Sequence, residues 1–282
     1  MSHFAVMVVT KKAPTRESIS EALQPYHEYE CTGINDKFVQ DIDITDQVRA
    51  AMADGEFKTL ESALIDYGLE NRIVSDESEV EKTGNGTHKY GYAVVKEGQL
   101  IKAIDRTNPN KKWDWWEIGG RWSGRLLNKS GEACDFLRKS DLDLELLQQK
   151  AIEGAAKRYD AAHDIIDGRP IPKWSEIRDA HEIEEARKIY QSDPVIKDFR
   201  EIIDSFGDVE EFAVSRETYL ENARKNALGI FAVVIGGKWF GRGEMGWWGC
   251  VFDEKADWLD IFNKILSEIP DNFWLTVVDC HR

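Results

Sequence analysis

The sequence has little cysteine and no long apolar run, and both absences narrow the classes of protein to which it can belong. Its 282 residues include four cysteines, Cys31, Cys134, Cys250 and Cys280, and no two lie closer than 30 positions. This spacing excludes a disulfide framework and the paired cysteines of a structural zinc site. No run reaches the roughly 18 apolar residues of a membrane span, and no basic region precedes the first apolar run. We expect a protein of a reducing cytosol without membrane contact, in which Cys280 forms an intermolecular disulfide only if it is exposed.

Positive charge is outweighed by negative charge. The sequence has 37 Lys and Arg against 52 Asp and Glu, a net charge of −15. Contact with nucleic-acid phosphates needs a basic surface, so direct binding of DNA or RNA is not expected. Acidity favours a partner with a basic surface, although it also fits a protein that is merely soluble.

Recognisable catalytic motifs are missing. The histidines form neither a His-x-x-x-His nor a His-Glu-x-x-His pattern, and no Gly-x-Ser-x-Gly elbow occurs. The glycines between Gly241 and Gly249 are not followed by Gly-Lys-Ser/Thr, so they do not form a phosphate-binding loop. We therefore expect a protein that is not an enzyme and needs no cofactor.

One polar stretch, residues 26–46, gathers side chains that can bind metal ions. Two carboxylates and a histidine are enough to hold a divalent ion. The spacing matches no standard site, however, and a solvated loop or capping network explains the same residues, so no metal site is expected. The weak candidates are His27, Glu30, Asp36, Asp41 and Asp43.

Apolar runs rich in β-branched and aromatic residues predict four strands. They cover Phe4–Val9, Tyr90–Val95, Gly229–Ile235 and Phe273–Val278. The first three share an aromatic-Ala-Val core and lie near the start, middle and end of the chain. We therefore expect an α+β fold with one mixed sheet formed from both ends of the chain.

Helix signals lie between the first two predicted strands. Thr15 is a predicted N-cap, and Pro25 ends the helix that follows it. Two further helices are predicted over Asp46–Met52 and Thr59–Tyr67.

Residues 141–226 differ from the rest. They carry 13 basic and 21 acidic residues, a charge of −8, and apolar residues at helical spacing. We expect three helices, with apolar faces over 142–159, 177–190 and 195–206. We interpret this segment as an acidic helical insertion, or arm, in a sheet domain formed by residues 1–140 and 227–282. The alternative is that these helices simply cover the sheet.

The most distinctive feature is a repeated element, Ile-Gly-Gly-basic-Trp-x-Gly-Arg, which occurs at 118–125 and again at 235–242. Glycine permits a tight turn or bulge that would project the tryptophan, and two such elements could line one cleft or one interface. The alternative is that both are hairpins whose aromatic side chains fill the core. Candidate partner- or ligand-binding residues are Trp113, Trp116, Arg121, Trp122, Arg125, Lys238, Trp239, Arg242, Trp247 and Trp248.

Three segments resemble proteins encoded by tailed bacteriophages and prophages. They are MSHF at 1–4, PYHEYECTGIND at 25–36 and TNPNKKWDWWEIGGRWSG at 107–124. The length, helical middle and acidity are also similar to phage anti-defence proteins of the Gabija anti-defence inhibitor type. That resemblance implies a non-enzymatic protein of the infected host's cytoplasm, which surrounds a bacterial nuclease–NTPase complex and denies it DNA.

The resemblance thus implies an inhibitor that acts by protein–protein binding on a host defence complex, and we expect a homo-oligomer if it encircles that target. One alternative is an enzyme or nucleotide-signal binder with an anion pocket between the two Gly-Gly-basic-Trp elements, formed by Arg121, Arg125, Lys238 and Arg242. A further alternative is an accessory or structural phage protein.

Overall fold

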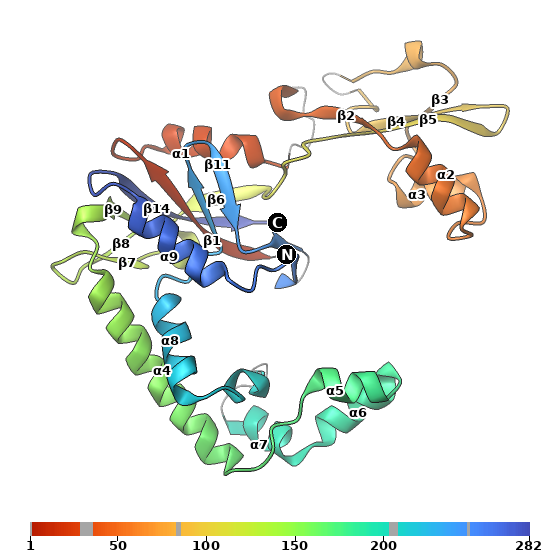
Figure 1. The fold of residues 1–282 in the computed structure, drawn as a ribbon. Coiled ribbons are helices and arrows are strands. Elements are labelled where there is room, and N and C mark those ends of the chain that lie inside the picture. The colour runs from red at the N-terminus through yellow and green to blue at the C-terminus, as the bar shows by residue number, and fades with distance from the viewer. Residues whose placement is uncertain (1, 29–35, 83–85, 203–207, 247–248) are drawn as a thin grey trace.

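The computed structural model describes residues 2–28, 36–82, 86–202, 208–246 and 249–282. The fold is α+β, as the sequence predicts. Figure 1 shows a central sheet, which carries both chain ends, and two extensions that project from it. We call residues 1–35, 108–140 and 227–282 the body, residues 36–107 the lobe and residues 141–226 the arm.

The body contains a six-stranded sheet formed from both ends of the chain, which confirms that prediction. The strand order is β11-β10-β1-β14-β6, and β9 also pairs with β14. β1 runs parallel to β10 and antiparallel to β14, so the sheet is mixed. The bounds are β1 His3–Thr10, β6 Trp115–Ile118, β9 Phe136–Arg138, β10 Ala232–Ile235, β11 Lys238–Gly241 and β14 Trp274–His281.

Two helices cover opposite faces of this sheet. Ile19 of α1 (Arg16–Leu23) packs in the same core as Phe4, whereas Phe262 of α9 (Trp258–Glu268) packs in the same core as Ala5. Successive side chains of a strand point to opposite faces, so β1 supplies both cores. Thr15 is the N-cap of α1 and accepts a hydrogen bond from the Ser18 backbone N–H, as predicted.

The lobe has a sheet of its own, in the order β2-β5-β4-β3. The prediction that the Tyr90–Val95 strand joins the terminal strands is therefore wrong. Its strand, β4, pairs locally with β5 across a two-residue turn at Glu97 and Gly98, both with positive φ. The bounds are β2 Gln40–Asp43, α2 Thr45–Ala53, α3 Leu60–Asp66, β3 Ile73–Val74, β4 Gly91–Lys96 and β5 Gln99–Thr107.

The arm is helical and has a separate core that includes Tyr159, Phe199 and Phe212. The single helix predicted over 177–190 is two helices, because the backbone is extended at His181 and Glu182. Residues 203–206 of the third predicted helix lie outside the described residues. The bounds are α4 Leu144–Ile166, α5 Trp174–Ala180, α6 Ile183–Ser192, α7 Pro194–Ile202 and α8 Arg216–Lys225.

Short elements complete the described chain. Two ribbons flank the main sheet: β7 (Leu126–Leu127) with β8 (Ala133–Cys134), and β12 (Glu244–Met245) with β13 (Val251–Phe252). The 3₁₀ turns are η1 Gln24–Tyr26, η2 Asp36–Phe38, η3 Glu77–Glu79, η4 Gly120–Trp122, η5 Lys139–Asp141 and η6 Val209–Phe212. Among the described helices, none is both long and apolar enough to cross a membrane.

Cys280 lies inside the body, although it is close to the C-terminal end of the sequence. Its side chain is fully buried, and burial raises the pKa of its thiol well above the ordinary value. An intermolecular disulfide through Cys280 therefore conflicts with the structure.

Candidate functional site

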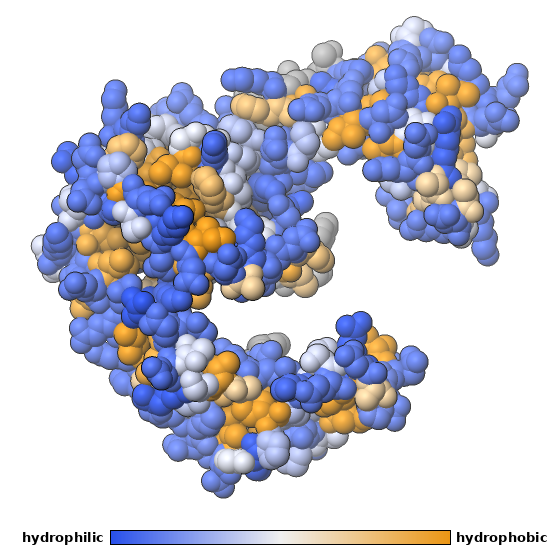
Figure 2. Space-filling model, in the orientation of Figure 1, coloured by the Kyte–Doolittle hydropathy of each residue, from blue (hydrophilic) through white to orange (hydrophobic). Residues whose placement is uncertain are grey.

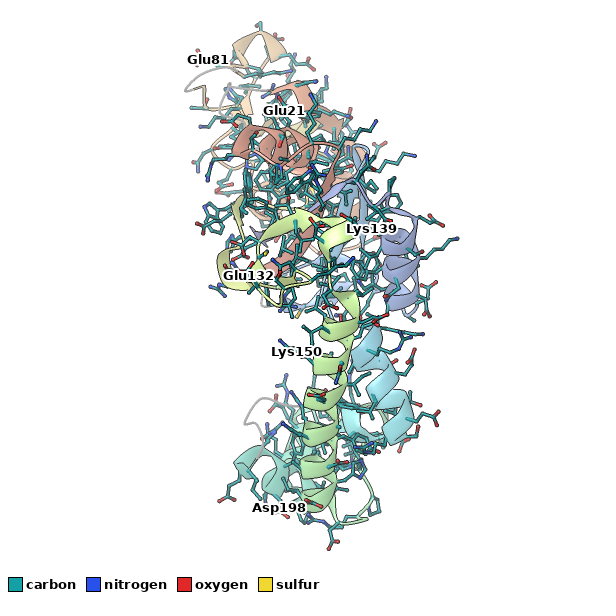
Figure 3. The ribbon with its side chains drawn as sticks, turned by 90° about the vertical axis from the view of Figure 1, so that its left-hand side faces the viewer. Glu21, Glu81, Glu132, Lys139, Lys150 and Asp198 are labelled. Carbon is teal, nitrogen blue, oxygen red and sulfur yellow. The ribbon has the colours of Figure 1, made fainter. Side chains whose placement is uncertain are left out.

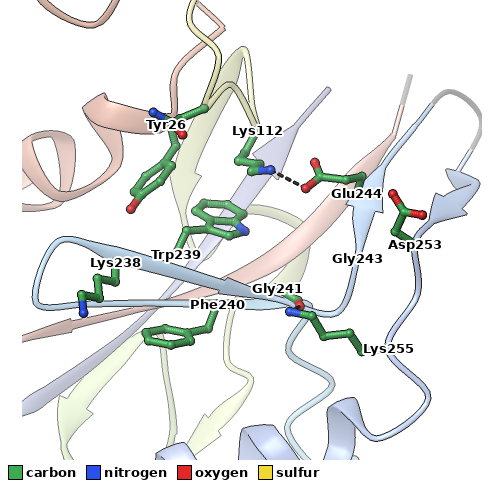
Figure 4. Close-up of a pocket in the computed structure, with 11 residues that line it drawn as sticks. Tyr26, Lys112, Lys238, Trp239, Phe240, Gly241, Gly243, Glu244, Asp253 and Lys255 are labelled. Carbon is green, nitrogen blue, oxygen red and sulfur yellow. Dashed lines mark hydrogen bonds and ion pairs between the residues drawn. The ribbon is translucent and has the colours of Figure 1, made fainter.

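The second Gly-Gly-basic-Trp element is a β-hairpin turn. Gly236 and Gly237, with φ of 59° and 74°, join β10 to β11. Positive φ at both central residues is the geometry that suits a two-residue hairpin loop, and glycine adopts it without a Cβ clash. The turn projects Trp239 toward Tyr26, with ring centroids 5.2 Å apart, while Phe240 points to the other side of β11 (Figure 4). The Tyr26 hydroxyl donates to the Gly237 carbonyl at 2.8 Å.

A cavity of about 500 Å³ opens beside this hairpin. Three lysines line it, but two already have partners: Lys112 pairs with Glu244, and Lys255 donates to the Gly241 carbonyl at 2.9 Å. Lys238 is exposed and has no ion pair with any described residue. A single unpaired ammonium group among these described lysines gives an anionic ligand little to bind. The other lining residues are Tyr26, Asn110, Trp239, Phe240, Gly241, Gly243, Glu244 and Asp253.

The first Gly-Gly-basic-Trp element has the same residue pattern but a different structure. Gly119 and Gly120, with φ of 71° and 51°, lead β6 into the 3₁₀ turn η4 instead of a hairpin. Asp279 of β14 accepts a hydrogen bond from the Arg121 backbone N–H at 3.0 Å. Gly120 lies so close to Asp279 that a Cβ at this position would come within 2.5 Å of it. Here glycine is required for close packing as well as for its φ.

Arg125 is part of the framework of the first element. Its guanidinium lies 4.7 Å from the ring centroid of Trp122 and donates to the Leu228 carbonyl at 3.0 Å. Burial lowers the pKa of Arg125 from its ordinary value. The Arg125 side chain therefore links Trp122 to the segment at Leu228, and it does not present a free charge to a ligand.

The two elements do not meet. The first follows β6 and the second includes β11, and these strands form opposite edges of the main sheet with β10, β1 and β14 between them. The expectation that the elements line one cleft is therefore wrong, and so is the anion pocket between them. Arg242 is also engaged, because its Nε donates to Glu254 at 2.6 Å.

The predicted tryptophan anchors differ in exposure. Trp113 is 6% exposed and its indole N–H donates to the Leu23 carbonyl at 3.1 Å, so it is a core residue. Trp116 is half-buried beneath Arg16, which lies 5.1 Å from its ring centroid. Trp115, which is not among the predicted anchors, is 47% exposed. Trp247 and Trp248 lie outside the described residues.

The weak metal candidates have structural partners. The His27 ring packs against Trp113 in a tilted arrangement with centroids 4.5 Å apart, and Asp41 pairs with Arg106 at 3.1 Å. Asp43 accepts hydrogen bonds from the hydroxyl and the backbone N–H of Thr45, and these bonds lower the pKa of Asp43. Glu30 lies outside the described residues, and Asp36 begins η2. Across the described chain, no group of three His, Cys, Asp or Glu side chains could hold a metal ion.

Charge is concentrated on the two extensions. The lobe has 9 basic and 15 acidic residues (−6) and the arm 13 and 21 (−8), so together they carry −14 of the net −15. Figure 2 shows the molecule hollowed between lobe and arm, with hydrophilic residues over much of the visible surface of both. In Figure 3, Glu81 of the lobe and Asp198 of the arm lie at opposite ends of the molecule. A nearly neutral body thus holds two acidic extensions apart.

Apolar side chains are exposed on the same extensions. Singly exposed apolar residues are common on protein surfaces and do not by themselves mark an interface. Seven large apolar residues of the described lobe and arm are exposed. They are Ile65, Ile73, Ile101, Ile183, Ile189, Ile202 and Val214.

Comparisons with family models, with curated proteins and with solved structures found no match for this chain.

Proposed function

We propose that this chain is a non-enzymatic binding protein that holds a partner with a basic surface between its lobe and its arm. The observation that carries the proposal is the distribution of charge: −14 of −15 lies on two extensions that flank a hollow. Electrostatic complementarity of this kind speeds encounter with a basic surface and fixes its orientation. The exposed apolar residues of both extensions would supply contacts that do not depend on salt.

The resemblance to phage proteins supports an identity for that partner. We propose that the chain is phage-encoded and acts in the host cell cytoplasm. There it forms a homo-oligomer that binds a Gabija-type nuclease–NTPase complex. A protein that reaches DNA must present a basic surface to it. The acidic lobe and arm would cover that surface and block access of DNA to it, without any chemical step.

Mixing the purified chain with a purified Gabija-type complex tests this proposal. We expect co-elution in size-exclusion chromatography at low salt, and loss of DNA binding by the complex when the chain is added. Failure to form a complex at low ionic strength would rule out the proposed target.

Charge reversal tests the role of the arm. Asp179 and Glu182 are exposed and form no ion pair with a described residue, so Asp179→Lys with Glu182→Lys changes the charge of the arm without breaking a contact. We expect an affinity about tenfold weaker, mainly through a slower association rate. Glu21→Lys with Glu268→Lys makes the same change of charge on the body and should leave the affinity unchanged. Equal effects of both pairs would contradict a specific role for the arm.

A further inference from the structure

Pairing of the chain ends places two histidines opposite each other. β1 and β14 are antiparallel, and their register pairs His3 with His281. Ser2 and Arg282 exchange both backbone hydrogen bonds, at 2.8 and 2.9 Å. The next pair along, His3 and His281, is therefore not hydrogen-bonded, and side chains approach most closely at such pairs. Their ring centroids lie 4.8 Å apart.

The Nδ1 atom of each imidazole lies beside a carboxylate. His3 Nδ1 lies 2.9 Å from Asp279 Oδ1, and His281 Nδ1 lies 2.6 Å from Asp114 Oδ1. An ionised carboxylate only accepts hydrogen bonds, so a neutral ring in this position carries its proton on Nδ1 and keeps its lone pair on Nε2. Metal-binding histidines have this arrangement: a carboxylate fixes the tautomer and orients the ring.

The two pairs are held in place by the body. The Asp279 side chain is 2% exposed and also accepts the Arg121 backbone N–H, which ties it to the first Gly-Gly element. His3 and His281 are 17% and 15% exposed, so their rings are confined yet reach solvent. Neither Nε2 has a hydrogen-bond partner among the described residues. No pattern in the sequence predicts this pairing, because it joins residues 278 positions apart.

We propose that His3 and His281 bind one divalent transition-metal ion, such as Zn²⁺, through their Nε2 atoms. An ion about 2.0–2.1 Å from two imidazole nitrogens places the ring centres about 5 Å apart, close to the separation observed. The carboxylates of Asp114 and Asp279, and that of Glu117 opposite Asp279, favour a cation.

The protein supplies only two ligands to this ion. Because no third His, Cys, Asp or Glu of the described chain completes a cluster, the other coordination positions are open to water or to a donor from a bound molecule. Figure 1 places both chain ends on the side of the main sheet that faces the space between lobe and arm. The open positions would therefore lie on the side proposed to receive the partner.

Calorimetric titration of the full, untagged chain with Zn²⁺ tests the site. We expect one ion per chain, and a loss of affinity of at least tenfold for His3→Ala and for His281→Ala. The control is His181→Ala, which removes an exposed histidine of the arm that also lies near a carboxylate, Glu185. Its affinity should equal that of the parent chain. Circular dichroism shows whether each variant is folded.

Two further measurements keep the proposal falsifiable if a histidine variant misfolds. Asp114→Asn removes an exposed carboxylate and no ligand, and should weaken Zn²⁺ binding about tenfold. The visible spectrum of the Co²⁺-substituted chain should change in Asp114→Asn and stay unchanged in His181→Ala. Absence of Zn²⁺ binding would overturn the site, and so would a loss caused by His3→Ala but not by His281→Ala. The partner-binding assay is repeated in EDTA, which removes Zn²⁺. Partner binding that persists in EDTA shows that the proposed function holds without the metal site.

Discussion

At the scale of single residues, glycine is needed for different physical reasons in the two Gly-Gly elements. A Cβ added at Gly236 would meet no other atom within 4 Å, so its turn needs glycine only for its positive φ. Gly120 needs it for φ and also for the contact with Asp279. A repeat in the sequence therefore marks a shared backbone preference and does not establish a shared structure.

Alanine substitution separates these two requirements. Gly236→Ala should cost about 1–2 kcal/mol in the free energy of unfolding, the penalty of a left-handed backbone. Gly120→Ala should cost about 1–3 kcal/mol more, because the new methyl group displaces Asp279 from the Arg121 N–H and leaves a buried carboxylate short of a partner. Urea denaturation measures both. Equal costs would show that the contact with Asp279 is not tight.

A second prediction concerns Asp105 in β5. Burial raises the pKa of Asp105, with Lys111 and Arg72 opposing that shift. Because the pKa of Asp105 is raised in the folded state, this carboxyl group stabilises the fold fully at pH values below its ordinary pKa of 3.8. That stabilisation is lost as pH rises through the folded-state pKa. Asp105→Asn, which stays neutral, should therefore raise the melting temperature at pH 7, and the gain should shrink toward pH 3.

Asp76 provides a control of opposite sign. Hydrogen bonds from the Ser78 backbone and side chain lower the pKa of Asp76, so its contribution is present above the ordinary value and lost as pH falls. Asp76→Asn should lower the melting temperature at pH 7. A gain in both variants at pH 7 would contradict the role of burial at Asp105.

At the scale of elements, local signals predict the N-cap of α1 and the strand β1. Long-range pairing is predicted only in part, because the main sheet joins both ends of the chain as expected but does not include β4. The N-cap Thr15 and the apolar run of β1 each depend on a few neighbouring residues, and both were predicted. Two sheets compete for β4, and pairing with the neighbouring β5 needs only a short turn, which costs less loop-closure entropy than a long connection. A shared aromatic-Ala-Val pattern carries no information about that competition.

The candidate site was harder to predict than the elements. β6 is not among the predicted strands, and exposure alternates along it, so Trp115 is exposed whereas Trp116 is half-buried. The helix α9 was also not predicted, although it covers one face of the main sheet. The histidine pair depends on the register of β1 with β14, and composition and spacing do not fix a register.

At the scale of the whole molecule, lobe and arm have separate hydrophobic cores. The core of the lobe gathers Val48, Leu64 and Ala103, and that of the arm gathers Tyr159, Phe199 and Phe212. Elements with their own cores open as separate cooperative units. The extensions can therefore be disrupted one at a time, which allows the contribution of each to partner binding to be measured.

Phe199→Ala makes that test in the arm. The side chain is 1% exposed and lies 5.4 Å from Phe212 between ring centroids, so its loss should cost about 3–5 kcal/mol. We expect amide hydrogen exchange to speed up across α4, α7 and α8 while β1 and β14 keep their protection. Zn²⁺ binding at the chain ends should persist, since β1 and β14 hold it, whereas affinity for the basic partner should fall because an unfolded arm no longer presents its charges in a fixed position. Loss of protection throughout β1 and β14 would show that arm and body unfold as one unit, and partner binding would then have to be assigned to the molecule as a whole.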